Sequence, residues 1–126
     1  MLECMKLGLP VLQPYGDCLR YDFVIEVNGK FYRVQVKTAN ANNIADGYIL
    51  FRCDNTTTKN GNVVHHSYTS DEIDFFATYY DGKCYLVPVG ECSREKRLRF
   101  TPPKNGQTQG ITFAKDYELE GMVSKL

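Results

Sequence analysis

A chain of 126 residues suffices for one domain and is too short for two, so we expect residues 1–126 to form a single unit. Hydrophobic residues make up 43% and charged residues 24%, which is ordinary for a globular fold, and the nine Tyr and seven Phe favour strands over helices. The formal net charge is zero, which argues against a strongly basic DNA binder, although binding depends on local patches rather than on the sum.

Five cysteines bear on the compartment: Cys4, Cys18, Cys53, Cys84 and Cys92. The count is odd and no pair has C-x-x-C spacing, so we expect a cytoplasmic protein with five free thiols. The longest apolar run is far too short to span a bilayer, and we expect no membrane association. The adjacent His65 and His66 would point to opposite faces of a strand and could not chelate one metal together, so we expect an exposed loop pair.

The predicted elements begin with a short helix. Residues 2–7 predict one or two helical turns, which Gly8 and Pro10 would end. A short strand at 11–13 and a turn at 14–17 follow.

The strongest local pattern is a hairpin. Two stretches of alternating apolar residues, 21–27 and 30–38, flank Asn28-Gly29, which is typical of a two-residue type I′ turn. Such a loop fixes the register of the two strands. It pairs Val27 with Lys30, Ile25 with Tyr32, Phe23 with Val34 and Asp22 with Gln35.

The two faces of this hairpin differ in polarity, because side chains alternate along each strand. One face is apolar and should be the core face; it holds Phe23, Ile25, Val27, Tyr32, Val34 and Val36. The other is mixed, and polar at the end far from the turn; it holds Asp22, Val24, Glu26, Phe31, Arg33, Gln35 and Lys37.

Further elements are predicted in the second half of the chain. In chain order they are a long strand at 47–53, a loop or flexible hairpin tip at 54–61, strands at 75–80 and 83–89, a strand at 97–100, a loop at 102–110 and a short helix at 111–119. Asp81-Gly82 is a second hairpin signal, and Ser70 can cap a helix start before the apolar run that begins at Ile73. Together these elements predict an α+β fold dominated by a sheet.

Four basic side chains fall within six positions: Arg94, Lys96, Arg97 and Arg99. They either form a patch that contacts DNA phosphates or lie on a solvated strand or loop, and the sequence leaves both interpretations open.

Three polar side chains converge at the end of the first hairpin that lies far from its turn. Opposed residues of an antiparallel pair have Cβ atoms about 4.5–5.5 Å apart, so Asp22 and Gln35 are neighbours, and Lys37 follows on the same face. A carboxylate and an amide oxygen can ligate a hard cation such as Mg²⁺, and an ammonium can reach a water molecule or a phosphate oxygen. The set suits phosphodiester hydrolysis; the alternative is an amphipathic hairpin with a cross-strand Asp–Lys pair.

The segment 8–39, GLPVLQPYGDCLRYDFVIEVNGKFYRVQVKTA, resembles the active-site region of PD-(D/E)xK endonucleases, in particular the group I intron-associated homing endonucleases. In that branch a G-x-x-V-x-x-P-x-G turn leads into Y-D, a hydrophobic hairpin follows, and Q-V-K-T closes it. The segments IDFFATYYDGKCYLVPV and KNGQ…AKDYEL are also similar, so the resemblance covers nearly the whole chain.

The resemblance implies a PD-(D/E)xK core with a mixed central β-sheet, a hairpin that carries the active site, and few short helices. It implies that Asp22 binds the metal, Mg²⁺ or Mn²⁺, that Gln35 occupies the acidic position of the motif and that Lys37 is its lysine. The Val36 carbonyl would be a further metal ligand. Tyr21 stands where the motif has Pro, and Gln35 replaces a carboxylate, as it does in this branch.

The family usually has a full helix ahead of this region, with a Glu that helps to bind metal. Because only seven residues precede Gly8, we expect a shortened N-terminal helix, with Glu3 as the carboxylate available there. Asp17 is a less favoured spare ligand, since a turn residue needs no functional explanation.

Two functions remain open. One is a metal-dependent endonuclease acting on double-stranded DNA, which would self-associate as a dimer or tetramer because a double-strand break needs two active sites. The other is a catalytically inactive module that keeps the nuclease fold and binds DNA or assembles with a partner. The neutral net charge and the single firm carboxylate favour the second, and the motif favours the first.

Overall fold

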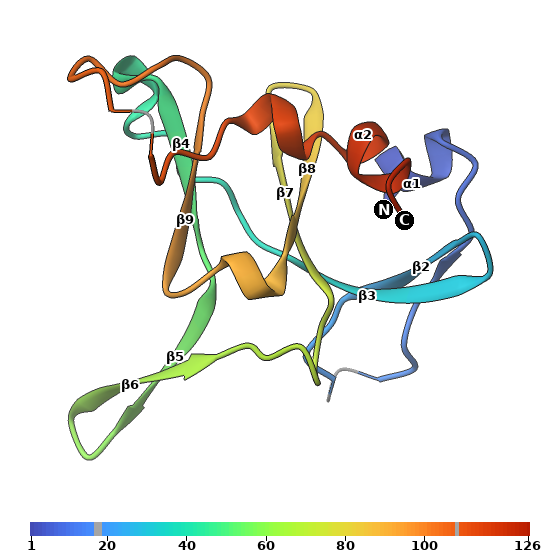
Figure 1. The fold of residues 1–126 in the computed structure, drawn as a ribbon. Coiled ribbons are helices and arrows are strands. Elements are labelled where there is room, and N and C mark those ends of the chain that lie inside the picture. The colour runs from blue at the N-terminus through green and yellow to red at the C-terminus, as the bar shows by residue number, and fades with distance from the viewer. Residues whose placement is uncertain (17–18, 108) are drawn as a thin grey trace.

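A mixed sheet of five strands lies at the centre of the fold (Figure 1). The structure is a computed structural model that describes residues 1–16, 19–107 and 109–126. Across the sheet the strands are β1 (Val11–Leu12), β2 (Phe23–Val27), β3 (Lys30–Val36), β7 (Phe75–Tyr80) and β8 (Lys83–Pro88). β3 and β7 run parallel, and the other neighbours run antiparallel. The predicted mixed central sheet is confirmed.

The β2–β3 hairpin forms in the predicted register. Asn28 and Gly29 have φ values of 51° and 80°, as a type I′ turn requires. The strands pair Phe23 with Val34, Ile25 with Tyr32 and Val27 with Lys30. The regular pairing ends at Phe23–Val34. The N–H of Asp22 donates to the Val34 carbonyl at 2.8 Å, one residue out of that register, so Asp22 lies beside the end of β3 and its predicted pairing with Gln35 is not part of the ladder.

Two further strand pairs flank the main sheet. β4 (Tyr48–Arg52) pairs with β9 (Glu95–Arg99), close to the predicted strands. β5 (Asp54–Lys59) and β6 (Asn62–Ser67) form a hairpin that projects from the rest of the fold in Figure 1. The sequence predicts a loop or a hairpin tip at 54–61; the hairpin is present, but its strands are longer than that. Exposed Thr and Asn residues give no apolar alternation that would reveal a strand.

The helices are few and short, as predicted. They are α1 (Leu2–Lys6), η1 (Ile44–Asp46), η2 (Val89–Glu91), η3 (Ala114–Tyr117) and α2 (Leu119–Val123), where η denotes a 3₁₀ turn. The single helix predicted at 111–119 is wrong, because Glu118 is extended (ψ 140°) and bridges to Tyr85 of β8, which separates η3 from α2. No helix within the described residues is both long and apolar enough to cross a membrane.

The helix start predicted at Ser70 does not form. Residues 69–72 make a single turn, in which the Thr69 N–H and hydroxyl donate to the Glu72 carboxylate at 3.2 and 3.3 Å. The next residues are drawn into the sheet, since the Asp74 N–H donates to the Arg33 carbonyl of β3 at 2.9 Å. Strand pairing with β3 therefore overrides the local helical signal.

Each face of the main sheet carries one hydrophobic cluster. The cluster shared with α1 and α2 holds Cys4, Phe23, Ile25, Val27, Val34, Phe75, Ala77, Leu86, Leu119 and Met122. The cluster shared with β4 and β9 holds Ile49, Phe51, Cys53, Tyr68, Ile73, Phe76, Tyr85, Val87, Val89, Leu98 and Ala114. The predicted core face is wrong at Val36, which is 45% exposed because β3 extends there past the first residue of β2.

Candidate active site

Asp22 lies one residue before β2, beside the part of β3 that β2 no longer covers. Its Oδ2 accepts a hydrogen bond from the Val36 N–H at 2.7 Å, and the side chain remains exposed. This bond fixes the carboxylate against the strand. Within the described residues Oδ1 accepts no hydrogen bond from the protein, so that oxygen is available to a cation.

The Val36 carbonyl faces the same edge. In a strand the N–H and C=O of one residue point to the same side, and the Val36 N–H points toward Asp22. The carbonyl is therefore directed past the start of β2 rather than into the ladder with β7. Two oxygen donors, one carboxylate and one carbonyl, thus lie at this edge.

Gln35 and Lys37 lie on the face of β3 opposite Val36, as strand alternation requires. Gln35 is half-buried. Lys37 follows the last residue of β3 and is anchored to β7: its N–H donates to the Ala77 carbonyl, and its carbonyl accepts from the Thr78 hydroxyl, both at 2.8 Å. The backbone at Lys37 is therefore held firmly by the sheet.

The ammonium of Lys37 points away from the cluster around Phe23 and toward the start of the β5–β6 hairpin. It donates to Asn55 Oδ1 at 3.0 Å and to the Tyr68 hydroxyl at 3.4 Å, and it lies 4.9 Å from the centre of the Tyr68 ring. The Arg20 guanidinium lies 3.8 Å from the same ring centre. Two cations thus share one buried aromatic ring, and Arg20 is also paired with the Glu72 carboxylate at 2.9 Å.

A buried ionic cluster lies beside Lys37. The side chain of Asp54 is fully buried and accepts hydrogen bonds from His65 Nδ1 at 2.7 Å and from Arg52 at 3.0 Å. Burial alone would raise the pKa of the Asp54 carboxyl, but the bonds from His65 and Arg52 outweigh it and hold the pKa below its ordinary value. Asp54 therefore stays ionised at neutral pH and ties β5 to β6 and β4.

Glu3 lies on the other face of the sheet from Lys37. α1 places Glu3 in a hollow that the side chains of Val36 and Phe23 also line, and its carboxylate pairs with Lys6 at 3.3 Å. Glu3 is thus near the candidate site but is not gathered with Gln35 and Lys37. Among the residues that the structure describes, no three His, Cys, Asp or Glu side chains are arranged to hold a metal ion. Asp17 lies outside the described residues.

The donors at this edge fit a hard divalent cation. The Asp22 carboxylate, the Gln35 amide and the Val36 carbonyl all offer oxygen, which Mg²⁺ and Mn²⁺ prefer and zinc does not require. Mg²⁺ is commonly held by only one or two carboxylates together with phosphate oxygens of the substrate. One firm carboxylate therefore suits a cation that binds together with a nucleic acid.

The four basic residues do not form one patch. The Arg97 and Arg99 guanidinium groups lie over the Tyr48 ring, 4.8 and 5.3 Å from its centre. Lys96 points to the other face of β9 and donates to a backbone carbonyl of η2 at 3.1 Å, while Arg94 precedes the strand and is exposed. Alternation along β9 divides the cluster between two faces, and the contact of these side chains with DNA phosphates stays a prediction.

Four of the five cysteines, Cys4, Cys53, Cys84 and Cys92, are free thiols, and Cys18 lies outside the described residues. A hydrogen bond with Cys92 lowers the pKa of the Cys53 thiol, against the effect of burial, and the nearby ammonium groups of Lys96 and Lys37 lower it further.

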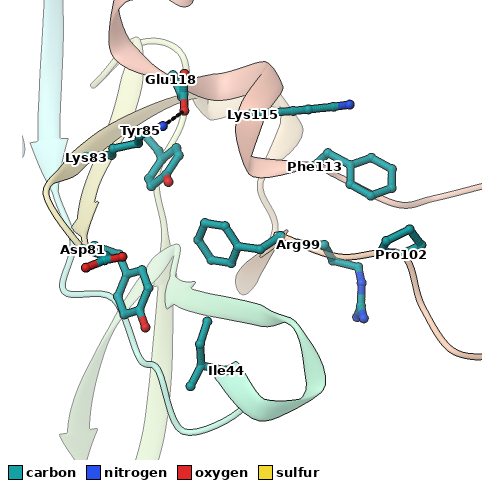
Figure 2. Close-up of a pocket in the computed structure, with 11 residues that line it drawn as sticks. Ile44, Asp81, Lys83, Tyr85, Arg99, Pro102, Phe113, Lys115 and Glu118 are labelled. Atoms are coloured by element: carbon teal, nitrogen blue, oxygen red, sulfur yellow. Dashed lines mark hydrogen bonds and ion pairs between the residues drawn. The ribbon is translucent and has the colours of Figure 1, made fainter.

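A large pocket lies elsewhere, at the turn end of the β7–β8 hairpin (Figure 2). Aromatic side chains line it: the Phe100 ring is tilted against Tyr80, with ring centres 5.7 Å apart, and lies edge-on to Tyr85 at 6.1 Å. Lys83 pairs with Glu118 at the rim at 2.7 Å. None of the predicted catalytic side chains lines it. The site at the start of β2 lies elsewhere than this pocket.

The sequence did not reveal the partners of Lys37. Asn55 and Tyr68 lie in stretches without a motif, and the interpretation of His65 and His66 as a loop pair is wrong, because both lie on β6. Their side chains do point to opposite faces: His65 contacts Asp54 and His66 contacts Thr57. The one local signal is that an acidic residue, Asp54, directly follows the strand predicted at 47–53.

Comparison with known proteins agrees with this geometry. The profile of the PD-(D/E)XK endonuclease family matches residues 1–120. Among solved structures the chain is similar to a bacterial homing endonuclease, I-Ssp6803I, with 25% identity and a TM-score of 0.76, over 98% of this chain and 85% of that one. No match was found among curated proteins. Nucleases of this fold use divalent metal ions in general. The chain therefore belongs to the PD-(D/E)XK endonuclease family and is a nuclease.

Proposed function

We propose that this nuclease cuts double-stranded DNA with Mg²⁺ or Mn²⁺, and that its active site lies where β2 begins beside the end of β3. One observation carries the proposal. The Asp22 carboxylate is fixed by the Val36 N–H at 2.7 Å, beside the end of β3 that also carries Gln35. Lys37 follows on the face of Gln35, so three groups of the family motif meet at one end of one hairpin.

Each residue has a distinct role in this proposal. Asp22, Gln35 and the Val36 carbonyl would hold the cation, with Glu3 as a candidate for a further contact from α1. When bound, the cation would lower the pKa of a water molecule and offset negative charge on the phosphate. Lys37 would orient the attacking water or stabilise the charge that develops on the phosphate, which is stabilisation of the transition state.

Contacts with DNA would come from basic groups on both faces of β9, namely Arg94, Lys96, Arg97 and Arg99. We further propose a homo-oligomer, a dimer or tetramer, since cutting both strands needs two active sites. The free thiols of the four described cysteines support a reducing, cytoplasmic setting. We also propose that residues 1–126 form a single domain.

The competing function is a nuclease fold without activity. The lack of a three-carboxylate cluster within the described residues favours it, and so does the zero net charge. It predicts that neither Mg²⁺ nor Mn²⁺ binds at Asp22.

Nicking of supercoiled plasmid DNA in Mg²⁺ or Mn²⁺ separates the two functions. The parent chain should cut only with metal, and Asp22→Asn should lose activity that excess Mn²⁺ partly restores, because the variant weakens metal affinity. Gln35→Glu should keep activity and bind the cation more tightly, since it adds a carboxylate. A parent chain that cuts no DNA with either metal would establish the inactive fold instead.

A further inference from the structure

The ammonium of Lys37 is held by residues outside the hairpin that carries the motif. Its shortest contact is with the side chain of Asn55, the second residue of β5, at 3.0 Å. The Tyr68 hydroxyl, at 3.4 Å, and the Asp54 carbonyl, at 3.5 Å, complete the set. All three acceptors are neutral oxygens, so the ammonium is oriented without being neutralised by a carboxylate.

Contacts with β4, β6 and β7 hold these acceptors in place. The buried Asp54 carboxylate binds His65 of β6 and Arg52 of β4, which fixes the backbone from which Asn55 projects. The Tyr68 ring packs edge-on against Phe76 of β7, with ring centres 5.3 Å apart. The start of the β5–β6 hairpin is therefore a rigid support, although the hairpin itself is exposed.

A lysine side chain is flexible and carries a large rotamer entropy when it is unrestrained. Lys37 would reach the reacting phosphate only in a fraction of its rotamers unless something holds it. Misplacement of a catalytic group by about 1 Å can cost on the order of a hundredfold in rate. A fixed acceptor at 3.0 Å restricts the ammonium to one region of space, on the face of β3 that also carries Gln35.

We propose that Asn55 is a positioning residue for Lys37, so that the start of the β5–β6 hairpin belongs to the catalytic apparatus. This rests on the proposed function, in which Lys37 acts on the scissile phosphate. Asn55 contributes through its side-chain oxygen and acts through Lys37, without a contact of its own to the reacting atoms.

Substitutions of Asn55 test the proposal. Asn55→Leu keeps the shape and removes the acceptor, whereas Asn55→Asp keeps the acceptor oxygen. With enzyme in excess over supercoiled plasmid in Mg²⁺, Asn55→Leu should slow the cleavage step about 10- to 100-fold. Asn55→Asp should stay within about threefold of the parent. Affinity for a fluorescent DNA duplex should change by less than about threefold in both, because only the cleavage step depends on the orientation of Lys37.

Matched controls separate positioning from folding. Thr57 lies on the same face of β5 as Asn55, but its hydroxyl contacts His66 rather than Lys37. The Thr57→Val variant loses that hydroxyl and should cleave DNA at the parent rate. If Asn55→Leu unfolds, Tyr68→Phe removes the second acceptor while keeping the ring, and it should slow cleavage without a loss of affinity. Equal rates for the parent, Asn55→Leu and Tyr68→Phe would overturn the proposal, and so would an Asn55→Asp variant as slow as Asn55→Leu.

The outcome for the proposed function is read separately. If the parent cuts no plasmid, or if Lys37→Ala cuts as fast as the parent, the proposed active site is wrong. If cleavage depends on Lys37 but not on Asn55 or Tyr68, only the positioning role is wrong.

Discussion

Removal of the His65 side chain should destabilise the fold measurably, although His65 lies on an exposed hairpin. His65 donates to the Asp54 carboxylate at 2.7 Å, and the Asp54 side chain is 0% exposed while that of His65 is 33% exposed. A hydrogen bond to a charged group contributes about 1.5–3 kcal/mol. Since water can reach the exposed side of His65 and Arg52 still binds Asp54, we expect His65→Ala to cost about 1–2 kcal/mol.

Thermal unfolding measures this directly, with a neighbouring histidine as control. A cost of this size should lower the melting temperature by roughly 3–8 °C in a domain of this length. His66 contacts only the exposed Thr57 hydroxyl, so His66→Ala should change stability by less than about 0.5 kcal/mol. Equal melting temperatures for parent and His65→Ala, or equal losses for His65→Ala and His66→Ala, would refute the argument that Asp54 depends on His65.

Three further predictions follow from particular contacts. The pKa of Asp54 is held below its ordinary value, so its contribution to stability is complete above about pH 4 and is lost as pH falls through the lowered pKa. The free energy of unfolding of Asp54→Asn should therefore fall less steeply than that of the parent in acid denaturation; parallel curves would contradict this. Gly47→Ala should cost about 1–3 kcal/mol in urea unfolding, because φ is +93° there and a Cβ would lie 2.0 Å from Thr101 Oγ1; an unchanged midpoint would contradict this. Changing Arg97 and Arg99 to Gln should weaken DNA binding across sequences and flatten its dependence on salt, and an unchanged salt slope would show that this face of β9 does not meet DNA.

The β2–β3 hairpin could be predicted in detail because its information is local. Asn28 and Gly29 specify the turn, the turn specifies the register, and alternation then assigns each side chain to a face. Asp22, Gln35 and Lys37 are within 15 positions of one another, so the candidate site followed from that one hairpin. The error at Val36 arose because alternation describes the face of a strand but not where the neighbouring strand ends.

Long-range contacts account for what the sequence could not predict. Asn55 and Tyr68 are 18 and 31 positions from Lys37, and their contacts depend on how the chain at the base of the β5–β6 hairpin meets the ends of β3 and β7. No local pattern encodes that arrangement. The break at Glu118 has the same origin, since pairing with β8 overrides the helical preference of the segment.

Single-turnover cleavage by Lys37→Ala tests the central claim most directly. Lys30→Ala is the matched control, because Lys30 lies on the same strand, is exposed and is far from the site. With Mg²⁺ or Mn²⁺ and saturating enzyme, Lys37→Ala should slow plasmid cleavage by on the order of 10²–10³-fold while DNA affinity and melting temperature stay close to those of the parent. Lys30→Ala should cut at the parent rate. A Lys37→Ala variant that cuts as fast as the parent would contradict the assignment of the active site to this end of the hairpin.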